Sequence, residues 1–155
     1  MASRVTPAGN QSVGGPAPSS FANGVAGGWI GYAVKTASQS SISTEVQVLS
    51  MNVTCTVNAS RKVRISCTGE TQVTNTDTTG VLRIKQDGVE IRGFPIGQRQ
   101  IAGGPGAQGH TFFAVVNPST GSHTYTVTLA RTTGTGTFAE SANDGILLVE
   151  DVGPA

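Results

Sequence analysis

Hydrophobic and polar residues alternate along most of the chain, and the clearest example is the stretch SHTYTVTLAR, residues 122–131. Tyr125, Val127 and Leu129 fall on one side of this stretch, and threonines fall on the other. A period of two, made of residues with high β-propensity, predicts a half-buried antiparallel strand. A strand of about ten residues is near the upper end of the usual length, and we expect it to have a neighbour on each edge.

Similar stretches follow one another from residue 29 onward, separated by turn-forming Gly, Asn, Asp and Ser residues. They predict strands at 29–35, 45–49, 51–57, 62–68, 81–86, 89–94, 110–116 and 145–151, with shorter segments near 36–44 and 137–141. No stretch has the period of a helix. We therefore expect an all-β fold, a jelly-roll-like antiparallel β-sandwich, formed by a single domain of residues 29–155.

Two of these strands are predicted to form a hairpin with a three-residue loop at 59–61. This register places Val57 opposite Val63, Cys55 opposite Ile65 and Val53 opposite Cys67. All six side chains then share one face, as a buried pair of strands requires. The two cysteines are diagonal, not opposite, in this arrangement.

Asp87 and Gly88 form the strongest turn signal, because Asp-Gly between two alternating segments is typical of a type I′ hairpin. A two-residue loop places Lys85 opposite Glu90, Ile84 opposite Ile91 and Arg83 opposite Arg92. The two arginines would repel each other unless strand twist, a nearby carboxylate or solvent separates their charges. We take Arg83 and Arg92 as a candidate surface for binding a partner.

The stretch HTFFAVV, residues 110–116, is apolar at both odd and even positions. Phe113 and Val115 alternate with Phe112 and Val116. A strand that is apolar on both faces is either central in the fold or covered by a partner.

Residues 1–28 differ from the rest of the chain because they are rich in Gly, Ala, Ser and Pro and have no periodicity. They carry too little apolar surface to fold alone. One interpretation is a flexible leader, and the other is an extended arm that becomes ordered on a neighbouring subunit. Four apolar side chains at wide intervals would contact that subunit: Val5, Val13, Phe21 and Val25.

Charge and composition narrow the classes of partner. Only 12% of the 155 residues are charged and the formal net charge is +1, so the clustered basic surface of a nucleic-acid-binding protein is not expected. The basic residues near 61–64 are interpreted as a solvated hairpin end. No segment is long enough to span a membrane and the first residues do not resemble a signal peptide, so we expect folding in a cytosol. Cys55 and Cys67 should then be reduced core thiols, with a disulfide across the sandwich as the alternative.

No motif of catalysis or metal binding appears in the sequence. The nucleophile elbow, the phosphate-binding loop and the ligand spacing of a zinc site are all missing. His110 and His123 both begin strands without a carboxylate beside them in sequence. We therefore predict no catalytic residue, no cofactor and no metal, and a protein that is not an enzyme.

Several phrases of the chain resemble a known family. They are RVTPAG, GYA with KTASQSSIST, NASRKVRIS, PSTGSHTYTVTLAR, GTGTF and GILLVEDVGPA, of which GSHTYTVTLAR and ILLVEDVGPA are the most specific. Together they cover most of the chain, and they are similar to small virion proteins of tailed phages that infect actinobacteria. Members are described as minor tail, head-fibre or decoration proteins, with folds like the trimeric C1q/TNF type of jelly roll.

The resemblance implies a homotrimer located in the virion, assembled in the bacterial host cytoplasm, with major capsid or tail proteins as partners. No catalytic residue is carried over, because the family has no catalytic motif. A short single domain with an arm favours a capsid decoration or head-fibre protein over a minor tail protein. A carbohydrate-binding or host-surface adhesin module that binds a glycan is the alternative, although one tryptophan is few for it. A hydrolase on a jelly-roll scaffold is a third, for which the sequence offers no site.

Overall fold

The computed structural model describes residues 28–75, 77–97, 106–140 and 145–155, and in these residues it contains ten strands and no helix. The strands are β1 (Gly28–Val34), β2 (Gln39–Ile42), β3 (Val46–Val57), β4 (Arg61–Val73), β5 (Thr79–Gln86), β6 (Val89–Gly97), β7 (Ala107–Val116), β8 (Gly121–Thr133), β9 (Phe138–Glu140) and β10 (Ile146–Pro154). The all-β prediction is confirmed. Across the described ranges, no helix is long and apolar enough to cross a membrane.

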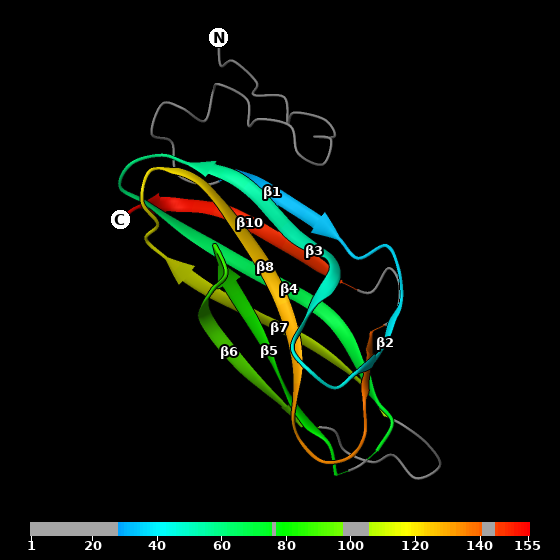
Figure 1. The fold of residues 1–155 in the computed structure, drawn as a ribbon. Helices are drawn as coiled ribbons and strands as arrows, with labels where there is room; N and C mark the ends of the chain where they lie inside the picture. Colours follow the sequence, from blue (N-terminus) through cyan, green and yellow to red (C-terminus); the bar gives the residue numbers. More distant parts are fainter. Residues whose placement is uncertain (1–27, 76, 98–105, 141–144) are drawn as a thin grey trace.

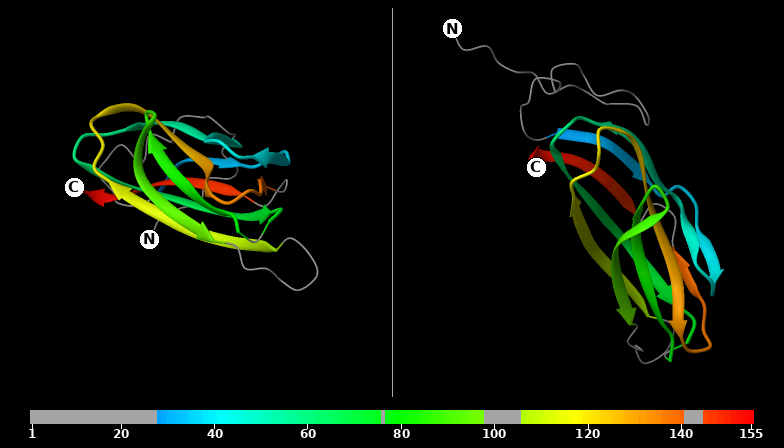
Figure 2. Two further views of the ribbon diagram at one scale, coloured as in Figure 1. Left: turned by 60° about the horizontal axis from the view of Figure 1, so that its bottom comes forward. Right: turned by 60° about the vertical axis from the view of Figure 1, so that its left-hand side comes forward.

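The strands form two antiparallel sheets that pack face to face as a jelly-roll-like sandwich (Figures 1 and 2). The first sheet, here called sheet A, has the order β1-β10-β4-β9-β2, and β7 pairs with the other edge of β4. The second, sheet B, has the order β3-β8-β5-β6. Strands distant in sequence are therefore neighbours, with the last strand, β10, lying between β1 and β4.

The strand that alternates most clearly, β8, lies inside sheet B with β3 on one edge and β5 on the other. Its residues Tyr125, Val127 and Leu129 point inward and are fully buried. They share the core with inward-facing residues of sheet A such as Ile65 and Val149. The prediction of a half-buried strand with two neighbours is confirmed.

The predicted hairpin between the cysteine-containing strands is wrong. β3 pairs with β8, while β4 pairs with β10 and β7, so the turn after Val57 carries the chain from one sheet to the other. All six residues of the predicted pairs are buried. Alternation establishes which side chains point inward, but inward-facing residues meet equally well across the sandwich and across a ladder.

Both cysteines are buried and free, as predicted. Cys55 lies in sheet B and Cys67 in sheet A. Burial raises the pKa of the Cys55 thiol to about 11 and that of Cys67 still further. Both groups are therefore neutral core thiols.

The turn at Asp87 and Gly88 is confirmed, since both residues have positive φ as a type I′ turn requires. Lys85 lies opposite Glu90 as expected. Beyond this pair the predicted register is wrong, because a bulge shifts β6 and places Ile84 opposite Arg92 and Arg83 opposite Gly93. An extra residue in one strand moves every later pair by one position.

β7 is an edge strand and is not central, because within the described residues it pairs only with β4. Phe112 and Ala114 face the core, while Phe113 and Val115 are 57% and 51% exposed on the outer face of sheet A. A central position therefore does not explain why the strand is apolar on both faces. Cover of its outer face by a partner stays a prediction.

Candidate functional site

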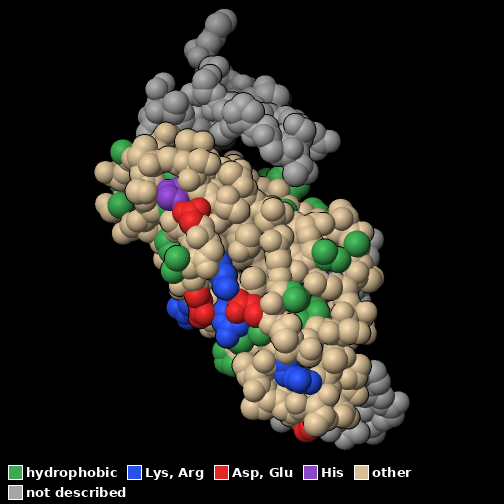
Figure 3. Space-filling model, viewed as in Figure 1, with side chains coloured by type: hydrophobic (Ala, Val, Ile, Leu, Met, Phe, Trp, Pro, Cys, Tyr) green, Lys and Arg blue, Asp and Glu red, His purple; other side chains and the backbone are tan. Residues whose placement is uncertain are grey.

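Arg83, one of the two arginines predicted to bind a partner, is held by carboxylates on the outer face of sheet B. Its Nε lies 2.8 Å from Glu90 Oε2 and its Nη1 3.4 Å from Glu45 Oε2. Glu45 also contacts Lys85 Nζ at 2.5 Å and accepts a hydrogen bond from Thr128 Oγ1. Figure 3 shows these charged side chains gathered in one cluster on an otherwise largely uncharged face. Their pairing leaves Arg83 little freedom to contact a partner.

The same cluster lowers the pKa of Glu45. The hydrogen bonds from the Lys85 ammonium and the Thr128 hydroxyl stabilise the ionised carboxylate and hold its pKa below the ordinary value. The carboxylate is therefore ionised at neutral pH. The cluster is a set of neutralised charges on the surface of sheet B.

Arg92 lies away from Arg83, because the bulge in β6 separates them. Its guanidinium is 5.2 Å from the centre of the Phe94 ring, and Phe94 packs on Phe112 at 4.3 Å between ring centres. Arg92 is exposed, so it is the arginine of the two that is open to a partner. The four apolar residues predicted to contact a partner through the arm, Val5, Val13, Phe21 and Val25, lie outside the described residues.

A larger candidate surface lies on the outer side of sheet A, and we call it the apolar face. Strand register places Tyr32, Leu148, Ser66 and Phe113 in one row across β1, β10, β4 and β7. The exposed apolar side chains of the face are Trp29, Val34, Phe113, Val115 and Ile146, and the first of these is 64% exposed. Tyr32 and Leu148 are half-buried among them.

The charges at the centre of the apolar face are paired. Arg64 and Glu150 are register partners in the centre of the sheet, with Nη2 and Oε2 2.7 Å apart. Lys62 and Glu70 lie at other outward positions of β4, on either side of this pair. The central pair leaves no net charge that would oppose the approach of another apolar surface.

Part of this face can be recognised in the sequence. The stretch that forms β7 is visibly apolar on both sides. The stretches GWIGYAV and ILLVEDVGP, which form β1 and β10, also carry apolar residues on outward positions. The sequence does not show the strand order that brings β1, β7 and β10 into one sheet.

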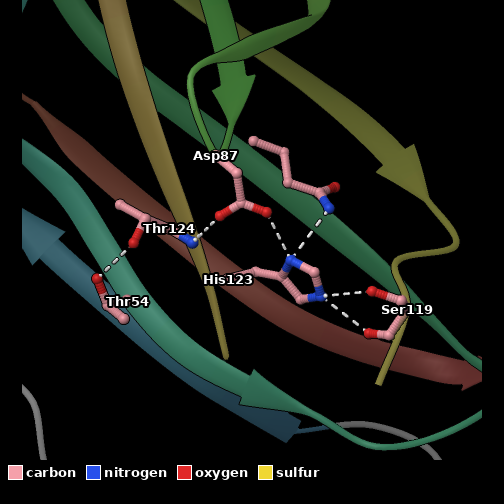
Figure 4. Close-up of polar contacts among 6 residues, drawn as sticks. Thr54, Asp87, Ser119, His123 and Thr124 are labelled. Carbon is pink, nitrogen blue, oxygen red and sulfur yellow. Dashed lines mark hydrogen bonds and ion pairs between the residues drawn. The ribbon is translucent and has the colours of Figure 1, made fainter. Parts of the chain in front are cut away.

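A third group of side chains meets where the β5–β6 turn approaches the start of β8 (Figure 4). His123 Nδ1 lies 2.7 Å from Asp87 Oδ2, and Ser119 Oγ lies 3.4 Å from His123 Nε2. The order of groups is that of a serine nucleophile, a base and an orienting acid. The sequence could not reveal it, because the aspartate lies in the β5–β6 turn and the histidine on β8, and only the pairing of β5 with β8 brings them together.

The hydrogen bonds differ from those of an activated serine. The shorter contact of Nε2 is with the Ser119 carbonyl oxygen at 2.8 Å. A carbonyl can only accept, so Nε2 carries a proton and is not placed as a base toward the hydroxyl. No group of three or more His, Cys, Asp and Glu side chains that could hold a metal ion occurs among the residues the structure describes.

Comparisons with known proteins add little. No protein-family model matches the sequence, and no curated protein matches it. Among solved structures, the chain is similar to a cycloisomaltooligosaccharide glucanotransferase of Paenibacillus sp. in complex with cycloisomaltoheptaose, at 13% identity and a TM-score of 0.29. The match covers 84% of this chain and 19% of that enzyme. A likeness this distant carries no argument about function.

Proposed function

We propose that this protein is a non-enzymatic structural component of a bacteriophage virion, a capsid decoration or head-fibre protein that attaches through residues 1–28. In this proposal three copies associate through the apolar face. The observation that carries it is the apolar outer side of sheet A, where Trp29, Ile146 and Phe113 are exposed on β1, β10 and β7 of one sheet.

Physical arguments favour a second copy as the cover of this face. Large exposed apolar patches are rare on monomeric proteins and mark interaction sites. Identical subunits provide identical patches, and closed rings of identical copies leave none of them open. Aromatic residues are enriched and unpaired charges depleted in the centres of such interfaces. Trp29 and Phe113, with Arg64 already neutralised by Glu150, fit this composition.

The resemblance to phage virion proteins supports the location. Its two most specific phrases form β8 and β10, which are inner strands of the two sheets. Strands at such positions are set mainly by the fold, although β10 also contributes Ile146 to the apolar face. The likeness is therefore informative about architecture, and the virion location rests on what that family does.

A trimer would also strengthen attachment. Three copies bring three segments of residues 1–28 to one particle, so that the second and third bind with a high effective concentration. Repeated attachment of this kind suits a capsid lattice. This is why we favour a head location over the tail.

Antibody labelling of particles tests the proposal. Antibodies raised against the purified protein should bind intact virions of the phage that carries the gene and should mark heads in electron micrographs. Label confined to tails would make it a minor tail protein. Particles that carry neither label nor the peptides of this chain in mass spectrometry would contradict the proposal. A glycan array that gives strong binding, abolished by Trp29→Ala, would favour the adhesin alternative.

A further inference from the structure

The imidazole of His123, on β8, connects the β5–β6 turn to the β7–β8 loop. These segments meet at the end of the sandwich at which β10 finishes (Figures 1 and 4). Its Nδ1 contacts Asp87 in the β5–β6 turn, at 2.7 Å, and its Nε2 contacts the Ser119 carbonyl in the β7–β8 loop, at 2.8 Å. His123 is the first inward-facing residue of β8 and is only 8% exposed. The ring therefore closes the end of the core and joins turn to loop.

Both contacts require a proton on the ring. A carbonyl oxygen only accepts, and a neutral imidazole has a single N–H to donate. Asp87 is ionised at neutral pH, because its contact with His123 and the Thr124 amide hold its pKa below the ordinary value. The Asp87 carboxylate at Nδ1 and the Ser119 carbonyl at Nε2 both accept a hydrogen bond only from the doubly protonated imidazolium.

The two contacts are not equivalent when a proton leaves. The turn has its own attachment, since Thr124 N–H donates to Asp87 Oδ1 and Asp87 N–H donates to the Thr124 carbonyl, both at 2.8 Å. The N–H that faces the carboxylate is the stronger hydrogen bond and is retained. Nε2 thus loses the proton, and its lone pair then faces the Ser119 carbonyl oxygen. Only the loop is left without its hydrogen bond.

The other groups around the ring do not carry charge near neutral pH. β3 places Cys55 opposite His123, and burial raises the pKa of this thiol to about 11. β8 contributes Tyr125, whose pKa burial also raises, and β5 contributes the neutral Gln86, 3.3 Å from Nδ1. The β7–β8 loop contributes Ser119, which is neutral. Among the described residues, Asp87 is thus the charged group within hydrogen-bond distance of the ring.

We propose that His123 is a pH-sensitive clip, which as imidazolium holds the β7–β8 loop against the β5–β6 turn and on losing its proton releases the loop while the turn stays attached. The Ser119 hydroxyl, 3.4 Å from Nε2, is placed to donate to the neutral ring once the carbonyl has moved away. The loop thereby exchanges a carbonyl contact for a hydroxyl contact. The device is independent of the virion proposal.

The sign of the pH dependence follows from the contacts. The Asp87 carboxylate first, and the Ser119 carbonyl second, raise the pKa of His123 above its ordinary value, against the opposing effect of burial. A group with a raised pKa in the folded state stabilises the protein fully below its unfolded pKa, and this contribution is lost as pH rises through the folded value. The loop is therefore clipped below the ordinary pKa of a histidine and released as pH rises through the raised pKa of His123.

A nuclear magnetic resonance titration of the full chain tests the clip. The chain has two histidines, so the ring signals of His123 and His110 are easily separated. His123 should titrate above the ordinary pKa of a histidine, and His110 below it because burial opposes its charge. The backbone amides of residues 117–120 should shift with the same midpoint as His123, while hydrogen-exchange protection of the Thr124 amide remains unchanged.

Two variants sharpen the test. Asp87→Asn should lower the pKa of His123 and move the midpoint of the loop amides with it. His123→Gln should abolish the pH dependence of the loop, since a carboxamide does not titrate. Loop amides that ignore the titration of His123 in the unmodified protein would overturn the proposal even if a variant failed to fold. So would a His123 that titrates at or below the ordinary pKa.

Discussion

The two outer faces of the sandwich are made by the same kind of strand but carry different chemistry. On sheet B the outward positions of β3 and β8 are mostly polar apart from Leu49, with threonines such as Thr54 and Thr124, whose hydroxyls lie 2.9 Å apart. Beside them the cluster of Glu45, Arg83 and Lys85 pairs its charges. On sheet A the outward positions of β1, β7 and β10 are largely apolar, and Glu150 among them is paired with Arg64 of β4.

The difference shows what each face is built for. Threonine suits a strand that is exposed to water on one side, because its branched carbon favours the strand and its hydroxyl is solvated. Apolar residues on both sides of a strand imply two surfaces to bury, and the core covers only one of them. We therefore propose that sheet A is covered by further copies, whereas the outer face of sheet B faces water.

Two adjacent residues of β7, one facing the core and one on the apolar face, test the difference between the buried and the outer side of sheet A. Phe112→Ala should lower the free energy of unfolding by about 3–5 kcal/mol, because Phe112 is buried and packs on Phe94. Phe113→Ala should leave the stability of the single chain within about 0.5 kcal/mol, as expected for a surface position. Urea denaturation of both variants at several protein concentrations measures this.

The dependence of stability on protein concentration provides the control for these two phenylalanine variants. If copies associate through the apolar face, the loss caused by Phe113→Ala grows with protein concentration, because association stabilises only the folded chain. The loss caused by Phe112→Ala has a large part that does not depend on concentration. Equal losses for the two phenylalanines at the lowest concentration would mean that β7 is covered on both sides within one chain.

The charge cluster of sheet B should contribute a smaller and pH-dependent amount. Glu45→Gln removes the partner of Lys85 and Arg83 and should cost about 0.2–1 kcal/mol at neutral pH, as is usual for ion pairs near the surface. Because the pKa of Glu45 is lowered, its contribution is present above its unfolded pKa and is lost as pH falls through the folded value.

Chemical denaturation at neutral pH and at pH values below the carboxylate range checks this expectation. The variant and the original protein should differ at neutral pH and converge in acid. The matched variant Thr56→Val, an outward position of β3 outside the cluster, should show the same small effect at every pH. A difference between the Glu45 variant and the original protein that persists in acid would assign the loss to packing and not to charge.

Much of the fold could be predicted from the alternating pattern, because period two identifies inward and outward positions directly. It correctly identified the inward residues of β8 and the buried thiols of Cys55 and Cys67. It could not identify strand partners. The hairpin between β3 and β4 was predicted wrongly for this reason, since the same inward residues satisfy either a shared ladder or two facing sheets.

The candidate sites depend on strand partners and were therefore harder to predict. Alternation alone places Arg83 opposite Arg92, but one extra residue in β6 shifts the register and separates the two side chains. The contact between Asp87 and His123 joins the β5–β6 turn to β8, and β5 and β8 are neighbours in sheet B but not in sequence. Of the apolar face, only the β7 part was visible, because a single strand can reveal its own composition but not its neighbours.

The last prediction concerns the reactivity of the two buried thiols and involves no change in stability. Cys55 and Cys67 should react very slowly with an alkylating agent in the folded protein at neutral pH, because burial raises the pKa of both thiols and blocks access. In denaturant without reductant, mass spectrometry should find two labels. An unlabelled chain would indicate a disulfide and contradict the free thiols.

The central claim is that the outer face of sheet A associates with further copies while that of sheet B does not. Sedimentation of the original protein at micromolar concentration, beside Phe113→Arg and Thr56→Arg, tests it most directly, because the two variants add the same charge to opposite faces. We predict a trimer for the original protein and for Thr56→Arg, and a folded monomer for Phe113→Arg. An original protein that sediments as a monomer, or a Phe113→Arg variant that remains a trimer, would contradict the claim.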